Sequence, residues 1–383
     1  MSRRWAAAII TLLGACSSTS VASNPRGVAS TDVTAEVTSA PTPDQIRCVA
    51  GLPLAVRVGQ LVWPAVTGDE LRRRAADVRR WGVGGVVLMT WTARSTAADL
   101  QALKSASPIP LLVATDEEGG SVQRLGDVGV LPSARTMAKQ RTPAEAGDVI
   151  AAHARALRDL GIDVVYAPVV DVSPITGSGP IGSRAFSQDP AVVTAFARAY
   201  VEAWESAGIL PVLKHFPGHG SASADSHEAS AVTPPLDQLR RRDLLPYVDL
   251  AGSGAAVMVG HLTVPGLTEP KTPASLSPAA IAGLLRTELG YATALVFTDA
   301  LGMDAITDGH TIAQAAVLAI IAGADVAIFT NTDQTDAVLA ALQDAVVAGQ
   351  LTDARLNEAV AHVLRAKQVD PCSIGSVRSS APG

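Results

Sequence analysis

The sequence predicts a single (β/α)8 barrel of the α/β class, and two patterns along the chain support this prediction. From Val58 onward, short runs rich in β-branched apolar residues alternate with longer segments that have a helical period. Several runs, such as residues 85–89, are apolar without a break, as expected of parallel strands that are covered on both faces. An open doubly wound sheet is the alternative, but no G-x-G-x-x-G or P-loop motif follows the early strands.

The predicted elements follow one another as strand and helix. The strand-like runs are Val58–Trp63, Val83–Met89, Pro110–Thr115, Asp163–Ala167, Leu210–Leu213, Ala255–Val259, Ala294–Thr298 and Asp325–Phe329. Segments of helix-forming composition lie between them, the clearest being Ala144–Asp159, Pro190–Ala207, Ser277–Glu288 and Ile312–Ile321. Ser277 followed by Pro278 is a typical helix start, since serine caps the first turn and proline fits the first helical position.

The N-terminus predicts export. Residues 1–15 have a short cationic start and an apolar run too short to span a bilayer, which is the pattern of a signal peptide. Residues 13–16, Leu-Gly-Ala-Cys, resemble the bacterial lipobox, so we expect lipidation at Cys16 and an anchor at the outer face of the cell membrane. A plain secreted protein is the alternative. The Ser- and Thr-rich tract that completes residues 16–45 predicts a flexible tether, with the barrel in 46–370 and a tail in 371–383.

The two remaining cysteines predict a disulfide, and the charge balance argues against one class of binding partner. Cys48 and Cys372 bracket the predicted barrel and would lie in an oxidising compartment, so we expect them to form a disulfide; two unrelated thiols are the alternative. The formal net charge is -6 and no block of basic residues is present, which argues against a nucleic-acid partner. The sequence does not predict a protein partner.

Polar residues gather directly after the predicted strands. In a barrel, the chemistry lies at the carboxyl ends of the strands, and charged residues are costly to bury elsewhere. Their repeated placement therefore predicts a polar pocket at that end. The segments concerned are 116–124 after the third run, Asp171 and 181–186 after the fourth, 214–227 after the fifth, His261 after the sixth and 298–303 after the seventh.

Some of these residues have ordinary structural explanations. Barrels often use aspartates as caps in their loops, so either Asp171 or Asp299, taken alone, is more readily a structural residue than a catalytic one. We also expect His261 to support the site rather than to act in it. The Gly- and His-rich segment 217–223 is different, because this composition suits a loop that closes over a substrate.

Two chemistries fit this set of residues. In glycoside hydrolysis, Asp299 would be the carboxylate nucleophile and His227 the proton donor, with Asp225 orienting and charging the imidazole. In metal-assisted hydrolysis, His215, His219, Asp225 and His227 would bind Zn²⁺. The second prediction is weaker, because no H-E-x-x-H pair is present and a Gly-rich loop is a poor metal cage. We therefore place the metal-dependent alternative well behind glycoside hydrolysis.

The motifs resemble those of a known family. Lys-His-Phe-Pro-Gly-His-Gly followed by Asp-Ser-His at 214–227 resembles the signature of the β-N-acetylglucosaminidase branch of glycoside hydrolase family 3. Further stretches match in the same order, namely 116–124, 167–171, 182–190 and 297–303. The resemblance runs from about Val58 to Ala366 and implies one catalytic barrel domain.

The resemblance also implies an activity and a set of residues for it. Enzymes of this branch cleave terminal β-linked N-acetylglucosamine with retention, through a covalent glycosyl-enzyme intermediate. Asp299 matches the nucleophile, His227 the general acid/base and Asp225 its partner. The positions that match the sugar-binding residues are Asp116, Arg124, Arg184, Lys214 and His215. The resemblance implies no metal and no organic cofactor.

With the predicted lipid anchor, the resemblance implies an enzyme that releases N-acetylglucosamine from muropeptides or other cell-wall fragments. Some relatives with a histidine donor use phosphate as the acceptor, so phosphorolysis on the same scaffold is an alternative. A barrel that binds wall glycans without catalysis is another alternative, although binding does not need a nucleophile.

Overall fold

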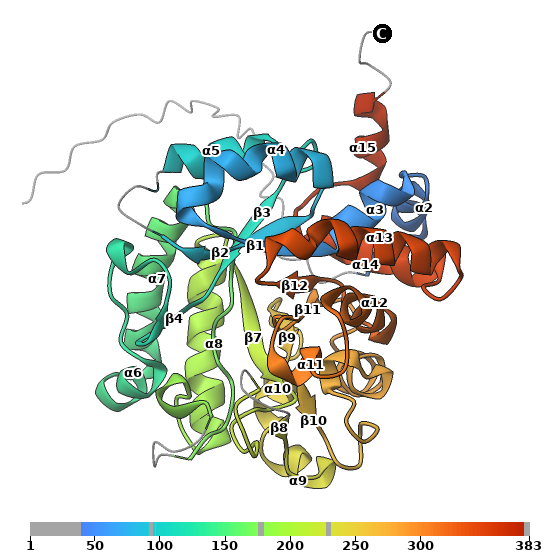
Figure 1. The fold of residues 1–383 in the computed structure, drawn as a ribbon. Coiled ribbons are helices and arrows are strands. Elements are labelled where there is room, and N and C mark those ends of the chain that lie inside the picture. Colours follow the sequence, from blue (N-terminus) through green and yellow to red (C-terminus); the bar gives the residue numbers. More distant parts are fainter. Residues whose placement is uncertain (1–39, 92–94, 96, 175–179, 227–230, 379–383) are drawn as a thin grey trace, which may run out of the picture.

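The computed structural model describes residues 40–91, 95, 97–174, 180–226 and 231–378. Within these residues, eight parallel strands form a barrel surrounded by helices (Figure 1). The strands lie in the order β11-β9-β7-β6-β3-β2-β1-β12, and a bridge between Phe297 and Val326 joins the two ends. The strands are β1 (Val62–Thr67), β2 (Gly85–Thr90), β3 (Leu112–Thr115), β6 (Val164–Val165), β7 (Leu210–Phe216), β9 (Ala256–Val259), β11 (Val296–Thr298) and β12 (Ala327–Phe329).

This architecture confirms the predicted (β/α)8 barrel. The barrel strands are buried almost throughout, as their continuous apolar sequences predict. Three buried aromatic side chains pack together, Trp63 from β1, Phe297 from β11 and Tyr166 directly after β6. The Phe297 ring lies edge-on to Trp63 at 5.2 Å and to Tyr166 at 5.6 Å, measured between ring centroids. The barrel is therefore a packed core, and a ligand can enter only at its ends.

The first predicted strand is partly wrong. Helix α3 (Leu54–Gln60) occupies the start of the predicted run, and β1 begins only at Val62. The last three residues of α3 are buried, and Gly59 packs so closely on the backbone of Gly82 that an added Cβ would lie 2.3 Å from the Gly82 carbonyl oxygen. A buried helix end and a buried strand have the same apolar composition, so the pattern could not separate them. The other seven predicted runs overlap barrel strands.

Helices of widely differing length surround the strands in the described residues. The α-helices are α2 (Pro43–Ala50), α3, α4 (Leu71–Trp81), α5 (Ala97–Ser105), α6 (Ala134–Gln140), α7 (Pro143–Leu160), α8 (Pro190–Ser206), α9 (Leu236–Arg241), α10 (Leu245–Asp249), α11 (Asp304–Thr307), α12 (Ile312–Ala322), α13 (Thr335–Val347), α14 (Asp353–Ala366) and α15 (Pro371–Arg378). Short 3-10 turns are η1 (Gly68–Glu70), η2 (Gly126–Val128), η3 (Gly182–Arg184), η4 (Ala274–Leu276) and η6 (Thr332–Gln334).

Local sequence signals account for the helix ends. Helix α7 begins with a capping box between Thr142 and Glu145 and ends at Gly161, whose φ of 104° is a left-handed conformation that suits glycine. The predicted helix Ser277–Glu288 is present as a π-helix, η5 (Ala279–Glu288). Its buried Arg286 reaches the carbonyl oxygen of Gly323, a long-range contact that the local sequence does not encode.

Two small sheets lie outside the barrel. The antiparallel hairpin β4 (Glu117–Gly119) and β5 (Val122–Gln123) follows β3, and the parallel pair β8 (Ala231–Val232) and β10 (Leu262–Thr263) follows β7 and β9. Both arise from the loops after barrel strands, so they lie at the carboxyl end of the barrel (Figure 1).

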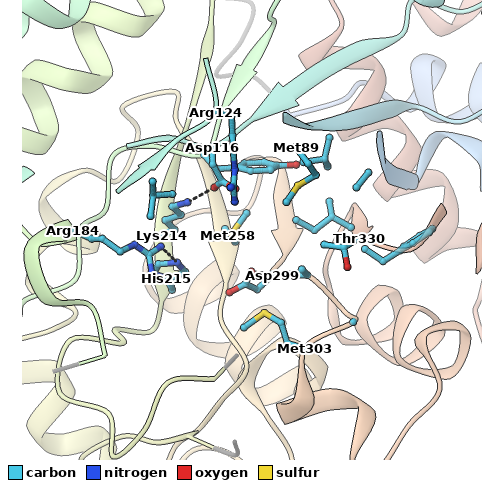
Figure 2. A pocket seen from close by; sticks show the side chains of 18 of the residues that line it. Met89, Asp116, Arg124, Arg184, Lys214, His215, Met258, Asp299, Met303 and Thr330 are labelled. Atoms are coloured by element: carbon cyan, nitrogen blue, oxygen red, sulfur yellow. Dashed lines mark hydrogen bonds and ion pairs between the residues drawn. The ribbon is translucent and has the colours of Figure 1, made fainter. Parts of the chain in front are cut away.

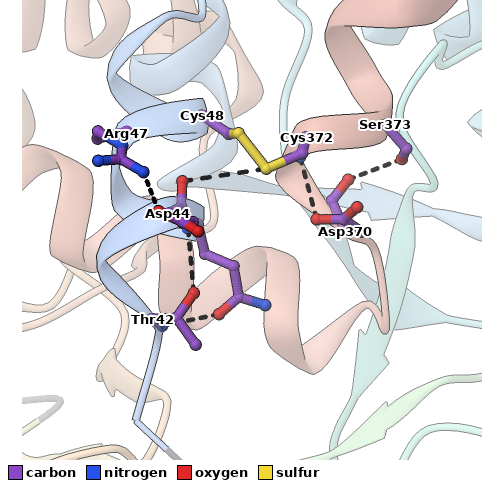
Figure 3. Close-up of a disulfide and its surroundings, with 8 residues drawn as sticks. Thr42, Asp44, Arg47, Cys48, Asp370, Cys372 and Ser373 are labelled. Atoms are coloured by element: carbon purple, nitrogen blue, oxygen red, sulfur yellow. Dashed lines mark hydrogen bonds and ion pairs between the residues drawn. A yellow bond between two sulfur atoms is a disulfide. The ribbon is translucent and has the colours of Figure 1, made fainter.

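The two ends of the described chain are joined. Helices α2 and α15 lie side by side, and a disulfide links Cys48 to Cys372 with a Cα–Cα distance of 4.9 Å (Figures 1 and 3). Helix α2 begins at Pro43, inside the predicted tether, and α15 occupies most of the predicted tail. Cys16 and the predicted signal peptide lie outside the described residues. Among the residues that are described, no helix combines the length and apolar character needed to cross a membrane.

Buried ion pairs support the amino end of the barrel. Asp163, directly before β6, accepts hydrogen bonds from Lys104, Arg158 and the Val113 amide. Asp325, before β12, occupies a similar position with Arg286, Arg355 and His362 as partners. Burial would raise the pKa of Asp325, but the charge of Arg286 and the His362 contact outweigh it and hold this pKa far below its usual range. These carboxylates lie away from the loops that carry the predicted site.

Candidate active site

A pocket of about 390 Å³ opens at the carboxyl ends of the strands. Figure 2 shows Arg184, Lys214 and His215 gathered on one side of it, with Asp299 and Met303 across from them. The predicted site residues among its lining are Asp116, Arg124, Arg184, Lys214, His215 and Asp299. The rest of the lining is mainly apolar and includes Met89, Met258, Ile328 and Phe329. The structure thus brings six of the predicted residues, from four segments of the chain, around one pocket.

A buried network of charges forms the polar wall. The Lys214 ammonium donates to Asp116 Oδ1 at 2.7 Å and lies 2.6 Å from Glu118 Oε1. Glu118 also accepts two hydrogen bonds from the Arg184 guanidinium, both at 2.7 Å. Arg124 approaches the other oxygen of Asp116 at 3.5 Å. Each long cationic side chain is therefore held by a carboxylate, which fixes its head group at the pocket wall.

Glu118 is the centre of this network, although the sequence analysis did not select it. Burial would raise the pKa of Glu118, but the charges of Lys214 and Arg184 outweigh it and lower the pKa to about 2. For Lys214, burial lowers the pKa, but the charges of Asp116 and Glu118 outweigh it and raise the pKa above its ordinary value. Both groups are therefore charged at neutral pH. An ammonium has three protons, so Lys214 keeps one donor for a ligand.

His215 is held in one tautomer by its neighbours. Its Nδ1 lies 2.7 Å from Asp171 Oδ2, and its Nε2 lies 3.2 Å from an Arg184 nitrogen. Because arginine can only donate, Nε2 accepts, and the proton of a neutral His215 lies on Nδ1, where it is donated to Asp171. Burial would raise the pKa of Asp171, but the His215 contact and the His219 amide lower it below its usual range. Asp171 is thus a supporting residue, as its loop position predicted.

Asp299 lies directly after β11 and is nearly buried. Its Oδ1 accepts the Ala300 amide at 2.8 Å, and its own amide donates to the Val259 carbonyl at 2.9 Å. His261 supports this segment, since its Nε2 lies 3.0 Å from the Ala300 carbonyl oxygen and its Nδ1 lies 2.7 Å from Ser275 Oγ. A carboxylate fixed at a strand end suits a group that must attack at a defined point.

The loop after β7 is fixed at its base. The His219 amide donates to Asp171 Oδ1 at 2.7 Å, and the His219 ring lies 3.0 Å from Ser226 Oγ. Burial, followed by the charge of His215, lowers the pKa of His219. Asp225 is half-buried in this loop and does not line the pocket, while His227 lies outside the described residues. The structure therefore brings together the predicted sugar-binding residues and Asp299, and leaves the geometry of the acid/base pair as a prediction.

The predicted zinc alternative fits this geometry poorly. Both ring nitrogens of His215 face other groups, and the Nε2 of His219 faces Ser226. In the described part of the chain, no group of three or more His, Cys, Asp or Glu side chains is arranged to hold a metal ion. A zinc ion at His215 Nε2 would have to displace the Arg184 guanidinium, itself a cation, from that nitrogen.

In this (β/α)8 barrel, a carboxylate faces a pocket wall of charged side chains that can bind hydroxyl groups. These features define a class of protein, the barrel enzymes that act on polar organic substrates. Comparison with known proteins gives the family. Residues 53–366 match the model described as the glycosyl hydrolase family 3 N terminal domain. The chain belongs to glycosyl hydrolase family 3 and is a glycoside hydrolase.

Relatives in this family resemble the chain over most of its length. Beta-hexosaminidase LpqI of Mycobacterium tuberculosis is 40% identical over 95% of this chain and 96% of its own length. The solved structure of M. tuberculosis LpqI has a TM-score of 0.79 at 41% identity, covering 84% of this chain and 96% of that one. A family 3 β-N-acetylglucosaminidase from Paenibacillus has a TM-score of 0.78 at 31% identity, covering 87% of this chain and 64% of that one.

Proposed function

We propose that the protein is a retaining exo-β-N-acetylglucosaminidase, with Asp299 as the nucleophile, His227 as the general acid/base and Asp225 as its partner. The observation that carries this proposal is the position of Asp299, which is fixed at a strand end across the pocket from a wall of groups suited to sugar hydroxyls. The names of the family 3 relatives, beta-hexosaminidase and β-N-acetylglucosaminidase, support the substrate class.

The polar wall binds the terminal sugar ring. Lys214 and Arg124 flank Asp116, so cationic donors and a carboxylate acceptor lie side by side at the wall. Such an arrangement binds neighbouring hydroxyls, which both donate and accept hydrogen bonds. Arg184 and His215 extend the same wall, held by Glu118 and Asp171. A fixed ring places its anomeric carbon against the nucleophile, which lowers the entropic part of the barrier.

The reaction then takes two steps. Asp299 attacks the anomeric carbon while the protonated His227 donates its proton to the leaving oxygen, which releases the aglycone and leaves a glycosyl ester on Asp299. His227 next removes a proton from water, and the hydroxide attacks the same carbon and releases Asp299. Asp225 orients the imidazole and favours its charged form before the first step. Two inversions at one carbon give net retention.

The cell envelope is the proposed place of action. The signal-like residues 1–15 and the lipobox ending at Cys16 support export and a lipid anchor at the outer face of the membrane. An enzyme in this position would meet muropeptides and other wall fragments that carry terminal N-acetylglucosamine. In cells, Cys16→Ala should move the protein from the membrane fraction to the soluble fraction; an unchanged membrane fraction would contradict the anchor.

The activity is tested with purified protein and 4-nitrophenyl β-N-acetylglucosaminide. The wild type should release 4-nitrophenol, and Asp299→Ala should lose at least about a thousandfold in kcat because the covalent step is gone. Asp308→Ala, which removes an exposed carboxylate nearby, is the matched control and should behave as the wild type. Residual turnover by Asp299→Ala at the wild-type rate would overturn the nucleophile assignment.

The same assay separates the alternatives. NMR of the first product should show β-N-acetylglucosamine, and it should still do so when inorganic phosphate is added. A sugar 1-phosphate as the main product would establish phosphorolysis instead. Activity that disappears with a chelator and returns with Zn²⁺ would support the metal-dependent alternative.

A further inference from the structure

Glu117 lies in sequence between Asp116 and Glu118, the two carboxylates that hold Lys214, but it does not line the pocket. Asp116 and Glu118 both contact Lys214 at the pocket wall, and in extended backbone the residue between them faces the opposite side. The Glu117 side chain is fully buried there, under the β4–β5 hairpin and against helix α7. A buried carboxylate is costly unless it is well paired, so its partners should indicate its role.

Four hydrogen-bond donors surround this carboxylate. On one side, Oε1 accepts from Gln123 Nε2 at 2.8 Å and lies 2.9 Å from His153 Nε2. On the other side, Oε2 accepts the amides of Arg124 and Leu125, both at 3.2 Å. A carboxylate has about four acceptor positions, so the set is complete. With only carboxylate oxygen facing it, His153 carries a proton on Nε2 and donates.

These contacts hold the part of the hairpin that carries Arg124. Strand β5 has only two residues, so its backbone ladder offers little stability of its own. The Arg124 amide is shared between Glu117 Oε2 and the Asp116 carbonyl oxygen at 3.1 Å, which ties it to the same backbone as the pocket carboxylate. Gln123 extends the support, since it accepts the Leu131 amide at 2.9 Å.

We propose that Glu117 is a positioning residue that holds Arg124 at the sugar-binding wall, and that His153 of α7 anchors Glu117 to the outer layer of the barrel. The inference rests on the proposed function for the role of Arg124 in binding the substrate. Glu117 does not touch the pocket, so it acts through the hairpin backbone. Its loss should therefore weaken substrate binding more than it slows the chemical steps.

Kinetics on the aryl glycoside test this difference. Glu117→Ala should raise KM by about tenfold and lower kcat by less than about threefold, since a loosened Arg124 binds ground state and transition state equally less well. Glu117→Gln keeps an acceptor for the two backbone amides but turns an NH₂ group toward Gln123, so its KM should lie between those of Glu117→Ala and the wild type. If Glu117→Ala does not fold, an unchanged KM of Glu117→Gln overturns the proposal.

A double-mutant cycle tests the route through Arg124. If Glu117 acts by placing Arg124, the variant that combines Glu117→Ala and Arg124→Ala should have nearly the KM of Arg124→Ala. KM effects that multiply, or an unchanged KM in Glu117→Ala, overturn the proposal. Asp163→Asn is the matched control, because it also removes a buried carboxylate that accepts a backbone amide, but at the other end of the barrel. It should lower the melting temperature and leave KM unchanged.

Hydrogen exchange gives a readout that does not depend on activity. In Glu117→Ala, the amides of Arg124 and Leu125 should exchange at least about tenfold faster, while those of the barrel strands keep their protection. Unchanged exchange in the hairpin overturns the anchoring role. A wild-type protein that does not cleave N-acetylglucosaminides would contradict the proposed function, and the exchange result would still decide whether Glu117 holds the hairpin.

Discussion

The most demanding prediction concerns Glu118, the buried carboxylate that holds both Lys214 and Arg184. Glu118→Gln keeps the shape of the side chain and removes its charge. An amide oxygen in the place of Oε1 can still accept from Lys214 and from one Arg184 nitrogen, but the NH₂ group in the place of Oε2 then faces the Arg184 Nε at hydrogen-bond distance. Two cations would be left in the pocket wall with one carboxylate fewer between them.

The pKa of Glu118 gives the size of the effect. Lowering this pKa from 4.5 to about 2 corresponds to about 3 kcal/mol, at about 1.4 kcal/mol for each unit of pKa. Breaking a buried ion pair by removing one partner costs about 3–5 kcal/mol in general, which agrees. We therefore expect Glu118→Gln to lower the free energy of unfolding by about 3 kcal/mol at pH 7.

The pH dependence follows from the direction of the shift. Because the folded-state pKa lies below the unfolded-state value, the stabilisation is fully present above pH 4.5 and is lost as the pH falls toward 2. The difference between the wild type and Glu118→Gln should therefore shrink steadily between pH 4.5 and pH 3. Glu118→Gln should also raise KM strongly, since Lys214 and Arg184 lose their shared anchor.

Urea unfolding at pH 7, 4.5, 3.5 and 3 measures the difference. Glu288→Gln is the matched control, because Glu288 pairs with Arg240 on the surface, where such a pair contributes at most about 1 kcal/mol. A loss below about 1 kcal/mol for Glu118→Gln at pH 7, or a difference that does not change between pH 4.5 and pH 3, would refute the reasoning.

Three further predictions concern the acid/base His227, the buried Lys367 directly after α14, and the disulfide. His227→Ala should slow substrates with poor leaving groups far more than aryl glycosides, and equal loss on both would contradict its donor role. Burial lowers the pKa of Lys367 to about 7, so its charge destabilises the fold below that pH, and stability should rise between pH 7 and 10. Lys367→Met loses the hydrogen bond to Gln60 and the attraction of Asp163 but no longer buries a charge, so it should add about 1–3 kcal/mol to the free energy of unfolding at pH 6. A less stable variant in urea unfolding would contradict this. Replacing Cys48 and Cys372 by serine should lower the free energy of unfolding by roughly 2–4 kcal/mol without changing KM; unchanged stability would show that the link constrains little.

Much of the fold could be predicted, because parallel strands that are covered on both faces have continuous apolar sequences. Val86 and Val87 in β2 are buried, as are Val257 and Val259 in β9, and their neighbours along the chain show the same pattern. The first strand was misplaced because the end of α3 is equally apolar and buried. The helix at η5 was predicted, but its π form was not, and the pairing of its Arg286 with the distant Asp325 has no local signal.

The residues that line the pocket were predicted better than the buried residues that hold them in place. Six lining residues lie in the segments that follow predicted strands, where the chemistry of a barrel gathers, although Lys214 and His215 turn out to be the end of β7 itself. Glu118 and Glu117 lie in the same acidic run as Asp116, but only alternation along the strand tells which carboxylates face the pocket and which face α7. That signal was present in the sequence and could have separated them. His153, the partner of Glu117, is 36 residues away and carries no local signal.

The most direct test of the account is to trap the covalent intermediate. A 5-fluoro N-acetylglucosaminyl fluoride has a good leaving group and a ring fluorine that slows both steps, so the glycosyl-enzyme should accumulate. Intact-protein mass spectrometry should show the addition of one fluorinated sugar, and peptide sequencing should place it on Asp299. A label on another residue, or no label while the fluoride is still consumed, would contradict the central claim that Asp299 is the nucleophile of a retaining glycosidase.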